Sequence, residues 1–511
     1  MIRAALVAAV VLVVPTLALA QGAPSTPANG APGVPAGPPQ SPNVPIPADN
    51  TIGMPKAAPN SNRNPNPDPS TYTGNNNAVN FGFDYGSYGR VGVGSDLRGH
   101  EGYGSDVVSH GTRYELAPYV ELAFYYTGKV GDDTYRKWRV VLVPAFAGGD
   151  LFHYTGSLDS HFILRNAYAE VENVGLKGLT LWVGSRTYRG DDMYQFNYWP
   201  LDNLNTVGAG ALFTKKRTTA ALHAGLNRLD SAYQYETLDT PPRGLGAPTS
   251  STVLDRPRAI VSFKLTQGFW REGSTHGAKV ALYGEFHALP SGDTTDATTR
   301  LVTPLPRDFG WVAGAQLSGW LRSNVFLNLW FRSAGGLAAY GELTAPTSLP
   351  IAHKVTGALE LVGAFAGNWE SKYVGLMVAS YARRFVDAAS GKYNSMSYTE
   401  GIVAVRPTVY LGKYFHLATE ISFQGRQSDG LDPYFGRVLK PKVFRASFAP
   451  TVSPTGKGSF ARPNLYLVYQ VSRINQDGLD ALFNAGDFRA LHDVVHYAGG
   501  GVEWWFNSSY R

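Results

Sequence analysis

The segment Asn464-Leu465-Tyr466-Leu467-Val468-Tyr469-Gln470-Val471-Ser472 carries Leu, Leu, Tyr and Val at its odd-numbered positions. Asn, Tyr, Gln and Ser stand at the even positions 464, 466, 470 and 472. Because successive side chains of a strand point to opposite faces, this alternation predicts a strand with one apolar and one polar face. The pattern recurs in His416–Gln424 and Arg113–Phe124. A soluble β-sandwich would show it too, so alternation alone does not decide the fold class.

The connections between such segments carry more information. Extending the pattern predicts eighteen strands, near residues 82–95, 111–127, 134–148, 161–174, 179–188, 206–213, 218–227, 256–268, 275–289, 308–321, 323–335, 355–368, 371–384, 400–411, 414–426, 441–452, 460–475 and 495–506. Long connections such as 96–110 and 149–160 alternate with short ones such as 128–133 and 175–178. Long loops at one end and tight turns at the other are typical of an outer-membrane barrel. The predicted fold class is therefore all-β, an 18-stranded antiparallel transmembrane β-barrel wide enough for a water-filled lumen.

The N-terminal residues belong to a different regime. Residues 1–20 have the features of a secretory signal peptide, because Arg3 precedes an apolar run and Ala18-Leu19-Ala20 forms a small-residue cleavage site. A retained membrane helix is the alternative. Between Gln21 and Ser70 lie 14 of the 33 prolines, which predicts a Pro/Asn-rich disordered linker over 21–78. The barrel domain is then expected to occupy 79–506, followed by a short tail, 507–511.

The composition agrees with this fold class. Aromatic residues make up 13 % of the chain, with 29 Tyr, against 16 % charged residues; Tyr and Trp gather where a barrel meets lipid headgroups. The chain has no cysteine, which excludes disulfide and thiol chemistry. Its net charge of +6 is spread without a Lys/Arg run, so no nucleic-acid partner is predicted.

No catalytic constellation is evident in the sequence. A GxSxG motif is lacking, and the 11 His residues are scattered without metal-ligand spacing. The pairs Asp132-Asp133 and Asp191-Asp192 could hold a cation or be solvated turn and loop charges. We therefore predict no enzymatic activity, no cofactor and no metal site, with a barrel enzyme such as an outer-membrane lipase or protease as the alternative.

Several motifs occur in the order found in a known family. Asp84-Tyr85-Gly86-Ser87-Tyr88-Gly89-Arg90-Val91-Gly92-Val93-Gly94 is similar to the opening strand of maltoporins and related sucrose porins, and Tyr119-Val120-Glu121-Leu122 to their second strand. Leu181-Trp182-Val183-Gly184-Ser185-Arg186-Thr187-Tyr188, followed by Phe196-Asn197-Tyr198-Trp199, resembles the strand and inward-folded third loop of that family. The remaining matches are Val405-Arg406-Pro407, Ala461-Arg462-Pro463 and Trp504-Trp505. The resemblance spans about residues 80–506.

The resemblance implies a homotrimer of 18-stranded barrels in the bacterial outer membrane, surrounded by lipid, each with an inward-folded loop constricting the pore. It also implies facilitated diffusion of carbohydrates, maltose, maltodextrins or other small sugars, along a slide of aromatic rings that stack on pyranose faces. Matching positions assign the slide aromatics to Tyr88, Tyr119 and Trp505. They assign the polar track, whose groups hydrogen-bond sugar hydroxyls, to Arg90, Arg113, Glu121, Arg165, Arg186, Arg189 and Asn197.

The chain departs from the family pattern at three places. Asn197 stands where the third loop carries a slide tyrosine, and the nearby acid is Gln195. A strand-14 tryptophan is replaced at Glu400-Gly401, with Tyr398 close by, and the slide phenylalanine expected near Ser323-Asn324 is missing. The slide is thus expected to be incomplete. A general or ion-selective porin of the same fold therefore stays open as an alternative, as does a structural or adhesion barrel.

Overall fold

A computed structural model describes residues 81–114, 118–131, 133–148, 161–227, 235–240, 249–254, 256–271, 274–295, 299, 301–322, 324–341, 355–388, 396–484 and 486–506. The signal peptide, the linker and the C-terminal tail that the sequence predicts lie outside the described residues. In the described part of the chain, no helix combines the length and the apolar character needed to cross a membrane.

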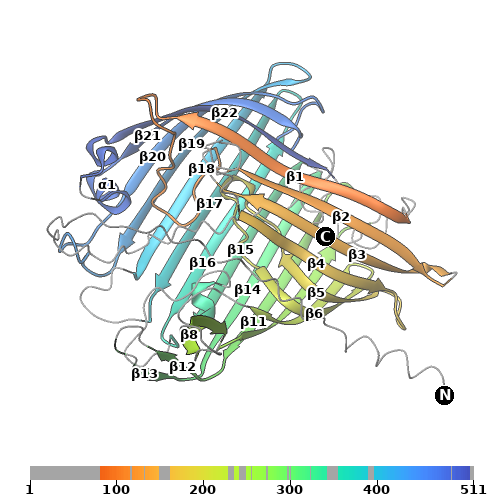
Figure 1. The fold of residues 1–511 in the computed structure, drawn as a ribbon. Coiled ribbons are helices and arrows are strands. Elements are labelled where there is room, and N and C mark those ends of the chain that lie inside the picture. The colour runs from red at the N-terminus through yellow and green to blue at the C-terminus, as the bar shows by residue number, and fades with distance from the viewer. Residues whose placement is uncertain are drawn as a thin grey trace. The chain divides into compact units, whose positions relative to one another are not determined.

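Eighteen strands of the described residues form one antiparallel sheet (Figure 1). They are β1 (Gly82–Ser95), β2 (Tyr119–Val130), β3 (Asp133–Ala147), β4 (His161–Glu172), β5 (Leu179–Arg189), β6 (Asn203–Lys215), β7 (Thr218–Asn227), β10 (Arg258–Phe269), β11 (Gly277–Leu289), β14 (Asp308–Arg322), β15 (Val325–Gly336), β16 (Leu359–Glu370), β17 (Val374–Val386), β18 (Tyr398–Tyr410), β19 (Phe415–Ser428), β20 (Lys442–Val452), β21 (Asn464–Ile474) and β22 (Val494–Phe506).

The remaining elements lie in the connections. They are the hairpins β8 (Tyr235–Thr240) with β9 (Thr249–Leu254) and β12 (Gly292–Thr295) with β13 (Val302–Leu305), and the short helices η2 (Tyr194–Phe196), η3 (Leu337–Tyr340), α1 (Gln476–Leu482) and η4 (Phe488–Leu491).

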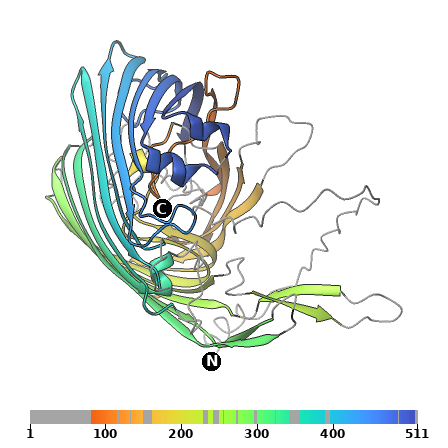
Figure 2. The same ribbon diagram turned by 90° about the vertical axis from the view of Figure 1, so that its left-hand side faces the viewer.

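The sheet closes on itself because β1 pairs with both β2 and β22. Tyr88 lies opposite Glu121 on one side and opposite Trp505 on the other. Each other strand pairs with the next strand of the sheet, so no edge is left unpaired in the membrane. Figure 2 shows the sheet curving round into a barrel. The predicted fold class, an 18-stranded antiparallel barrel, is confirmed.

The wall has an apolar outer face and a polar inner face. On β15, Leu327, Leu329 and Phe331 are 44–58 % exposed, whereas Asn328 and Trp330 between them are 2 % and 3 % exposed. Apolar side chains exposed on alternate positions suit a lipid-facing belt, and their neighbours line the lumen. Short turns join β2 to β3 and β6 to β7, while the connections after β1, β5 and β21 are long. By the same rule the long connections mark the extracellular end.

One predicted strand is wrong in its first part. The sequence pattern started a strand at 111, but β2 begins at Tyr119. Residues 105–114 leave the wall and make contacts inside the barrel: Arg445 of β20 donates to Ser105 Oγ at 2.8 Å and to Thr112 Oγ1 at 2.7 Å. The alternation of Arg113 with its neighbours therefore reflects loop contacts and not a strand.

Candidate functional site

A row of aromatic rings lines the barrel where its first and last strands meet. Tyr88 on β1 and Trp505 on β22 stack with ring centroids 6.5 Å apart and an interplanar angle of 20°. Tyr119 on β2 adjoins Tyr88 with centroids 5.9 Å apart. All three side chains point inward and are at most 6 % exposed. The three aromatics that the sequence assigned to the slide are thus brought together.

The row continues through residues that the sequence assignment missed. Tyr194, in the connection between β5 and β6, lies 6.2 Å from Trp505 in a T-shaped contact. Phe460, in the turn between β20 and β21, lies 5.6 Å from Tyr194, and Phe326 on β15 lies 6.1 Å from Phe460. Phe326 stands just after Ser323-Asn324, near which the family pattern places a slide phenylalanine. We call these six residues, Tyr119, Tyr88, Trp505, Tyr194, Phe460 and Phe326, the aromatic row.

The carboxylate of Glu503 gathers four donors beside this row. Arg113 Nη2 lies 2.7 Å from Oε1, and Arg462 Nη2 lies 2.7 Å from Oε2. The hydroxyls of Tyr88 and Tyr194 donate to the same carboxylate at 3.1 and 2.7 Å. Burial by itself lowers the pKa of Arg113, but the charge of Glu503 reverses this and holds the pKa above its ordinary value. Arg113 therefore stays charged inside the barrel.

A second ion pair flanks the other end of the row. Glu121 Oε2 accepts from Arg165 Nη1 at 3.0 Å and from the hydroxyl of Tyr119 at 2.9 Å. Arg165 and Glu121 are 1 % and 0 % exposed. The register of β3 with β4 shifts at Arg165, which is the extra residue of a bulge. Two residues of the predicted polar track thus pair directly behind a row aromatic.

The other predicted track residues are distributed unevenly. Arg90 lies over the ring of Tyr119, 5.8 Å from its centroid, and belongs to the same site. Arg189 lies 4.3 Å over the ring of Trp199, which packs in the same hydrophobic cluster as Tyr88. Arg186 instead contacts Glu170 at 3.3 Å and the ring of Tyr168, so it lies apart from the aromatic row.

Asn197 has a backbone role that the sequence comparison did not anticipate. It ends η2 with φ 52° and ψ 41°, the left-handed conformation that Asn adopts more readily than most residues. The turn places Phe196 and Tyr198 side by side against Tyr381 of β17, with centroids 6.0 and 5.4 Å away. A tyrosine at this position would be disfavoured by the backbone.

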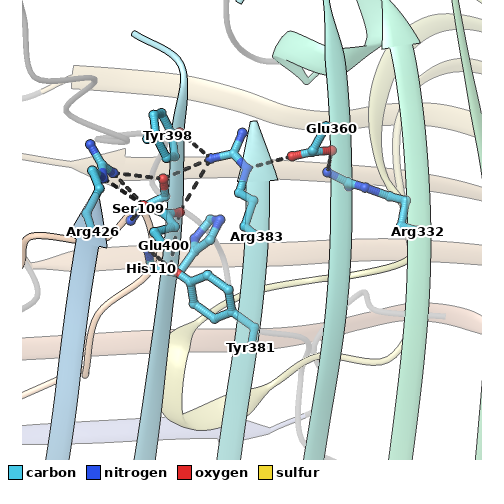
Figure 3. Close-up of polar contacts among 9 residues, drawn as sticks. All are labelled: Ser109, His110, Arg332, Glu360, Tyr381, Arg383, Tyr398, Glu400 and Arg426. Atoms are coloured by element: carbon cyan, nitrogen blue, oxygen red, sulfur yellow. Dashed lines mark hydrogen bonds and ion pairs between the residues drawn. The ribbon is translucent and has the colours of Figure 1, made fainter. Parts of the chain in front are cut away.

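A chain of alternating charges crosses five neighbouring strands nearer the extracellular end (Figure 3). Arg332 of β15 pairs with Glu360 of β16, which accepts from Arg383 Nε of β17 at 2.7 Å. Arg383 lies 3.7 Å from Glu400 of β18, which accepts from Arg426 of β19 at 2.6 Å. We call these five residues, Arg332, Glu360, Arg383, Glu400 and Arg426, the charge ladder. Each carboxylate lies between two guanidiniums, which offsets the cost of burying it.

Residues of the connection between β1 and β2 reach this ladder. Ser109 Oγ accepts from Arg383 Nη1 at 2.8 Å and from Arg426 Nη2 at 3.3 Å. The ring of His110 lies on the ring of Tyr198, with centroids 3.9 Å apart and an interplanar angle of 17°. The connection between β1 and β2 therefore meets the connection between β5 and β6 inside the barrel, through His110 on Tyr198 and through Arg113, which donates to the carbonyl of Tyr194 at 3.1 Å.

The space left beside the Glu503 ion pairs is small. A cavity of about 70 Å³ is lined by Arg90, Arg113, Arg406, Arg462 and Glu503, among other residues. This space is large enough for several waters. Arg406 pairs with Glu420 at 2.7 Å. The positive charges here are thus partly neutralised by the protein.

Asp191, one of the acidic residues that could have held a cation, pairs with protein donors instead. Asp191 Oδ2 accepts from Lys279 Nζ and from Gln316 Nε2, both at 2.5 Å. Among the described residues, no group of three or more His, Asp or Glu side chains is placed to hold a metal ion.

A closed barrel with an apolar outer wall and an aromatic, charged interior defines an outer-membrane porin. The chain belongs to the LamB porin family, the maltoporins, whose family model matches residues 83–506. The fold and the family both point to a channel. No curated protein matches the chain.

Solved structures of other outer-membrane proteins are similar to the chain at low identity. The channel DcaP of Acinetobacter baumannii is 11 % identical, covers 83 % of this chain and 98 % of its own, and has a TM-score of 0.44. OccD3 of Pseudomonas aeruginosa is 10 % identical over 88 % of this chain and 99 % of its own, with a TM-score of 0.42. Wzi of Escherichia coli, described as a carbohydrate-binding β-barrel, is 11 % identical over 83 % and 85 %, with a TM-score of 0.37. Nothing about the solute rests on these similarities.

Proposed function

We propose that this porin conducts carbohydrates across the outer membrane by facilitated diffusion. The observation that carries the proposal is the aromatic row beside the Glu503 ion pairs. A pyranose has an apolar face, which stacks on aromatic rings, and hydroxyls, which need hydrogen-bond partners. Both kinds of partner lie side by side on the inner wall. Stacking at several rings in series binds weakly enough to allow release, and so supports flux.

Two indole groups add donors to this surface. Among the described residues, neither Trp505 Nε1 nor Trp199 Nε1 has a hydrogen-bond partner, although both atoms are buried. A buried donor without an acceptor costs about 1–3 kcal/mol. The oxygen of a sugar hydroxyl that reached either ring could accept from its N–H.

The same proposal covers the residues assigned from the family. The connection between β5 and β6 would form the constriction, with Tyr88, Tyr119 and Trp505 as slide rings. The polar track would comprise Arg90, Arg113, Glu121, Arg165, Arg189 and Asn197, with Arg186 as a separate polar group on β5. We further propose a homotrimer in the outer membrane, exported by residues 1–20 and preceded by a linker of 21–78.

A general or ion-selective porin is the second candidate. The small cavity beside Tyr194 favours it, since a narrow water-filled space suits ions and small solutes. Such a pore would pass ions and small solutes by size and charge alone. Selection among sugars of equal size separates the two functions.

Liposome swelling tests the proposal. Purified protein in liposomes should admit maltose, sucrose and lactose at rates that differ severalfold, because the three disaccharides have equal mass but present different faces to the rings. The Trp505→Ala variant should reduce these differences. Equal rates for all three sugars through the wild type would overturn the proposal in favour of a general porin.

A further inference from the structure

The contacts of Ser109 at the charge ladder are those of a bound hydroxyl. Its Oγ accepts from two guanidiniums, of Arg383 and Arg426. Its backbone N–H donates to Glu400 Oε2 at 3.1 Å. An oxygen held between two arginines, beside a donor directed at a carboxylate, is the arrangement that neighbouring hydroxyls of a sugar require.

The next residue supplies the flat face. The ring of His110 stacks on Tyr198 at 3.9 Å and meets Tyr381 edge-on, with centroids 5.8 Å apart. Its backbone N–H donates to the hydroxyl of Tyr381 at 3.0 Å. A pyranose ring likewise stacks by its apolar face and donates from hydroxyls at its edge. Figure 3 shows Ser109 and His110 together against the inner wall.

The charge state of His110 also matches that of a sugar ring. Burial, helped by the charge of Arg383, lowers the pKa of His110 to about 3. The ring is therefore neutral at physiological pH, as a sugar is. The surrounding site holds further rings, since Tyr198 and Tyr381 pack in one hydrophobic cluster with Phe196 and Trp330.

We propose that the charge ladder, Tyr198 and Tyr381 form a second carbohydrate-binding site, occupied in the absence of solute by the chain's own Ser109-His110. The ligand class is a pyranoside with free hydroxyls. Sugar and loop compete for the site, so an entering sugar displaces residues 105–114 and opens the lumen beside the charge ladder. This inference rests on the proposed carbohydrate function.

The competition sets the direction of the expected effects. A tethered competitor lowers the apparent affinity of the free ligand by the fraction of time that the site is open. Removing Ser109 Oγ and the His110 ring should therefore tighten sugar binding and raise ion conductance together. If the loop only braced the barrel, removing these two groups would raise the conductance and leave the affinity for sugar unchanged.

Thiol labelling follows the loop directly, because the chain has no cysteine. Ser109→Cys protein in bilayers is treated with a charged thiol reagent, with and without maltotriose. Maltotriose should accelerate labelling of Cys at 109 severalfold as the loop leaves the site. Leu97→Cys, in the same connection and 60 % exposed in the wild type, should label at one rate in both conditions. A sugar that blocks the current but leaves the rate at 109 unchanged, or slows it, overturns the inference.

Current block supplies the second readout. The Ser109→Gly/His110→Ala variant should bind maltotriose about three- to tenfold more tightly than the wild type. Leu97→Ala is the matched control, because Leu97 lies in the same connection but outside residues 105–114 and is 60 % exposed; its block should equal that of the wild type. Unchanged block in the double variant, or equal tightening in the control, overturns the inference and leaves the proposed function standing. If maltotriose fails to block the wild type at all, both are overturned.

Discussion

Tyr88 and Trp505 are 417 positions apart in sequence, yet they lie opposite each other in the pairing of β1 with β22, and their rings stack 6.5 Å apart. The surface proposed to bind sugar is thus built where the barrel closes. The surface is complete only when the first strand, which carries Tyr88, has paired with the last strand, which carries Trp505. Barrel closure and solute binding therefore depend on the same residues.

Adjacent tryptophans of β22 separate these two roles. Trp505 points into the lumen, whereas Trp504 lies on the other face and donates to Ser87 Oγ at 3.0 Å. Trp505→Ala should weaken maltotriose block by about two- to tenfold, since one stacking contact contributes ~0.5–1.5 kcal/mol. Trp504→Ala should leave the block unchanged, even if it slows barrel assembly as much as Trp505→Ala does. Equal loss of block in both variants, measured in planar bilayers, would contradict the inward assignment.

Tyr119 combines a ring with a hydroxyl that donates to Glu121. Tyr119→Ala should weaken sugar block by about two- to tenfold and enlarge the conductance, because it removes both a stacking surface and bulk from the lumen. Tyr119→Phe keeps the ring and should retain most of the affinity. If the Phe variant loses as much as the Ala variant, the hydroxyl and not the ring carries binding.

Glu503 balances the charge of Arg113 and Arg462. Glu503→Gln should shift the reversal potential in a KCl gradient toward anion selectivity, because two guanidiniums then face the lumen with no carboxylate between them. Breaking a buried pair costs on the order of 3–5 kcal/mol, so the melting temperature should also fall. Glu172→Gln breaks the more exposed pair with Lys137 and serves as the control. An unchanged reversal potential in the Glu503 variant would show that the Glu503 cluster does not lie on the ion path.

Acid should release the loop that carries His110. The pKa of His110 falls from 6.5 to about 3 when the ring is buried on Tyr198. The released ring therefore takes up protons that the docked ring does not, and docking is full above pH 6.5 and weakens as the pH falls toward 3. The loss is roughly tenfold in the docking equilibrium for each pH unit in that window.

Conductance recorded at pH 7 and pH 5 measures this release. The wild type should conduct more at pH 5, whereas His110→Phe, which keeps a ring on Tyr198, should change less. The charged groups near the His110 ring are Arg332, Arg383 and Glu400, and the ring also contacts Tyr198 and Tyr381. All of these residues are still present in the His110→Phe variant. Equal responses in the two proteins would assign the pH effect to those groups and not to His110.

The Pro-rich segment should be dispensable for the pore. The barrel starts with β1, and every strand of its sheet pairs with strands that lie within residues 82–506. Deleting 25–70 should therefore leave conductance and sugar block unchanged. Loss of heat-modifiable migration on gels after this deletion would show that the segment takes part in assembly.

The strands were predictable because each has one lipid-facing and one lumen-facing side, which leaves a period of two in the sequence. The same parity places Glu503 beside Trp505 on the inner face, so its role could have been inferred. Tyr194 and Phe460 could not, since they lie in connections that have no period. Their contacts with Trp505 and with each other depend on where those connections fold.

The charge ladder shows a further limit of sequence reasoning. Arg383 and Glu400 stand opposite each other on neighbouring strands, but only the register of β17 with β18 reveals it. Glu400 stands where the family pattern has an aromatic residue. Its carboxylate accepts hydrogen bonds from Arg426 Nε and from the backbone N–H of Ser109. Comparison with a family pattern marked the position as a departure but could not assign partners to the acid.

Ion current through reconstituted channels with maltotriose added to one side tests the central claim most directly. The account predicts reversible, concentration-dependent block with a millimolar dissociation constant, weakened in Trp505→Ala and preserved in Trp504→Ala. A current that maltotriose does not interrupt at any concentration, in wild type and variants alike, would contradict it. The chain would then be a general porin that has the barrel of its family without the sugar-binding surface.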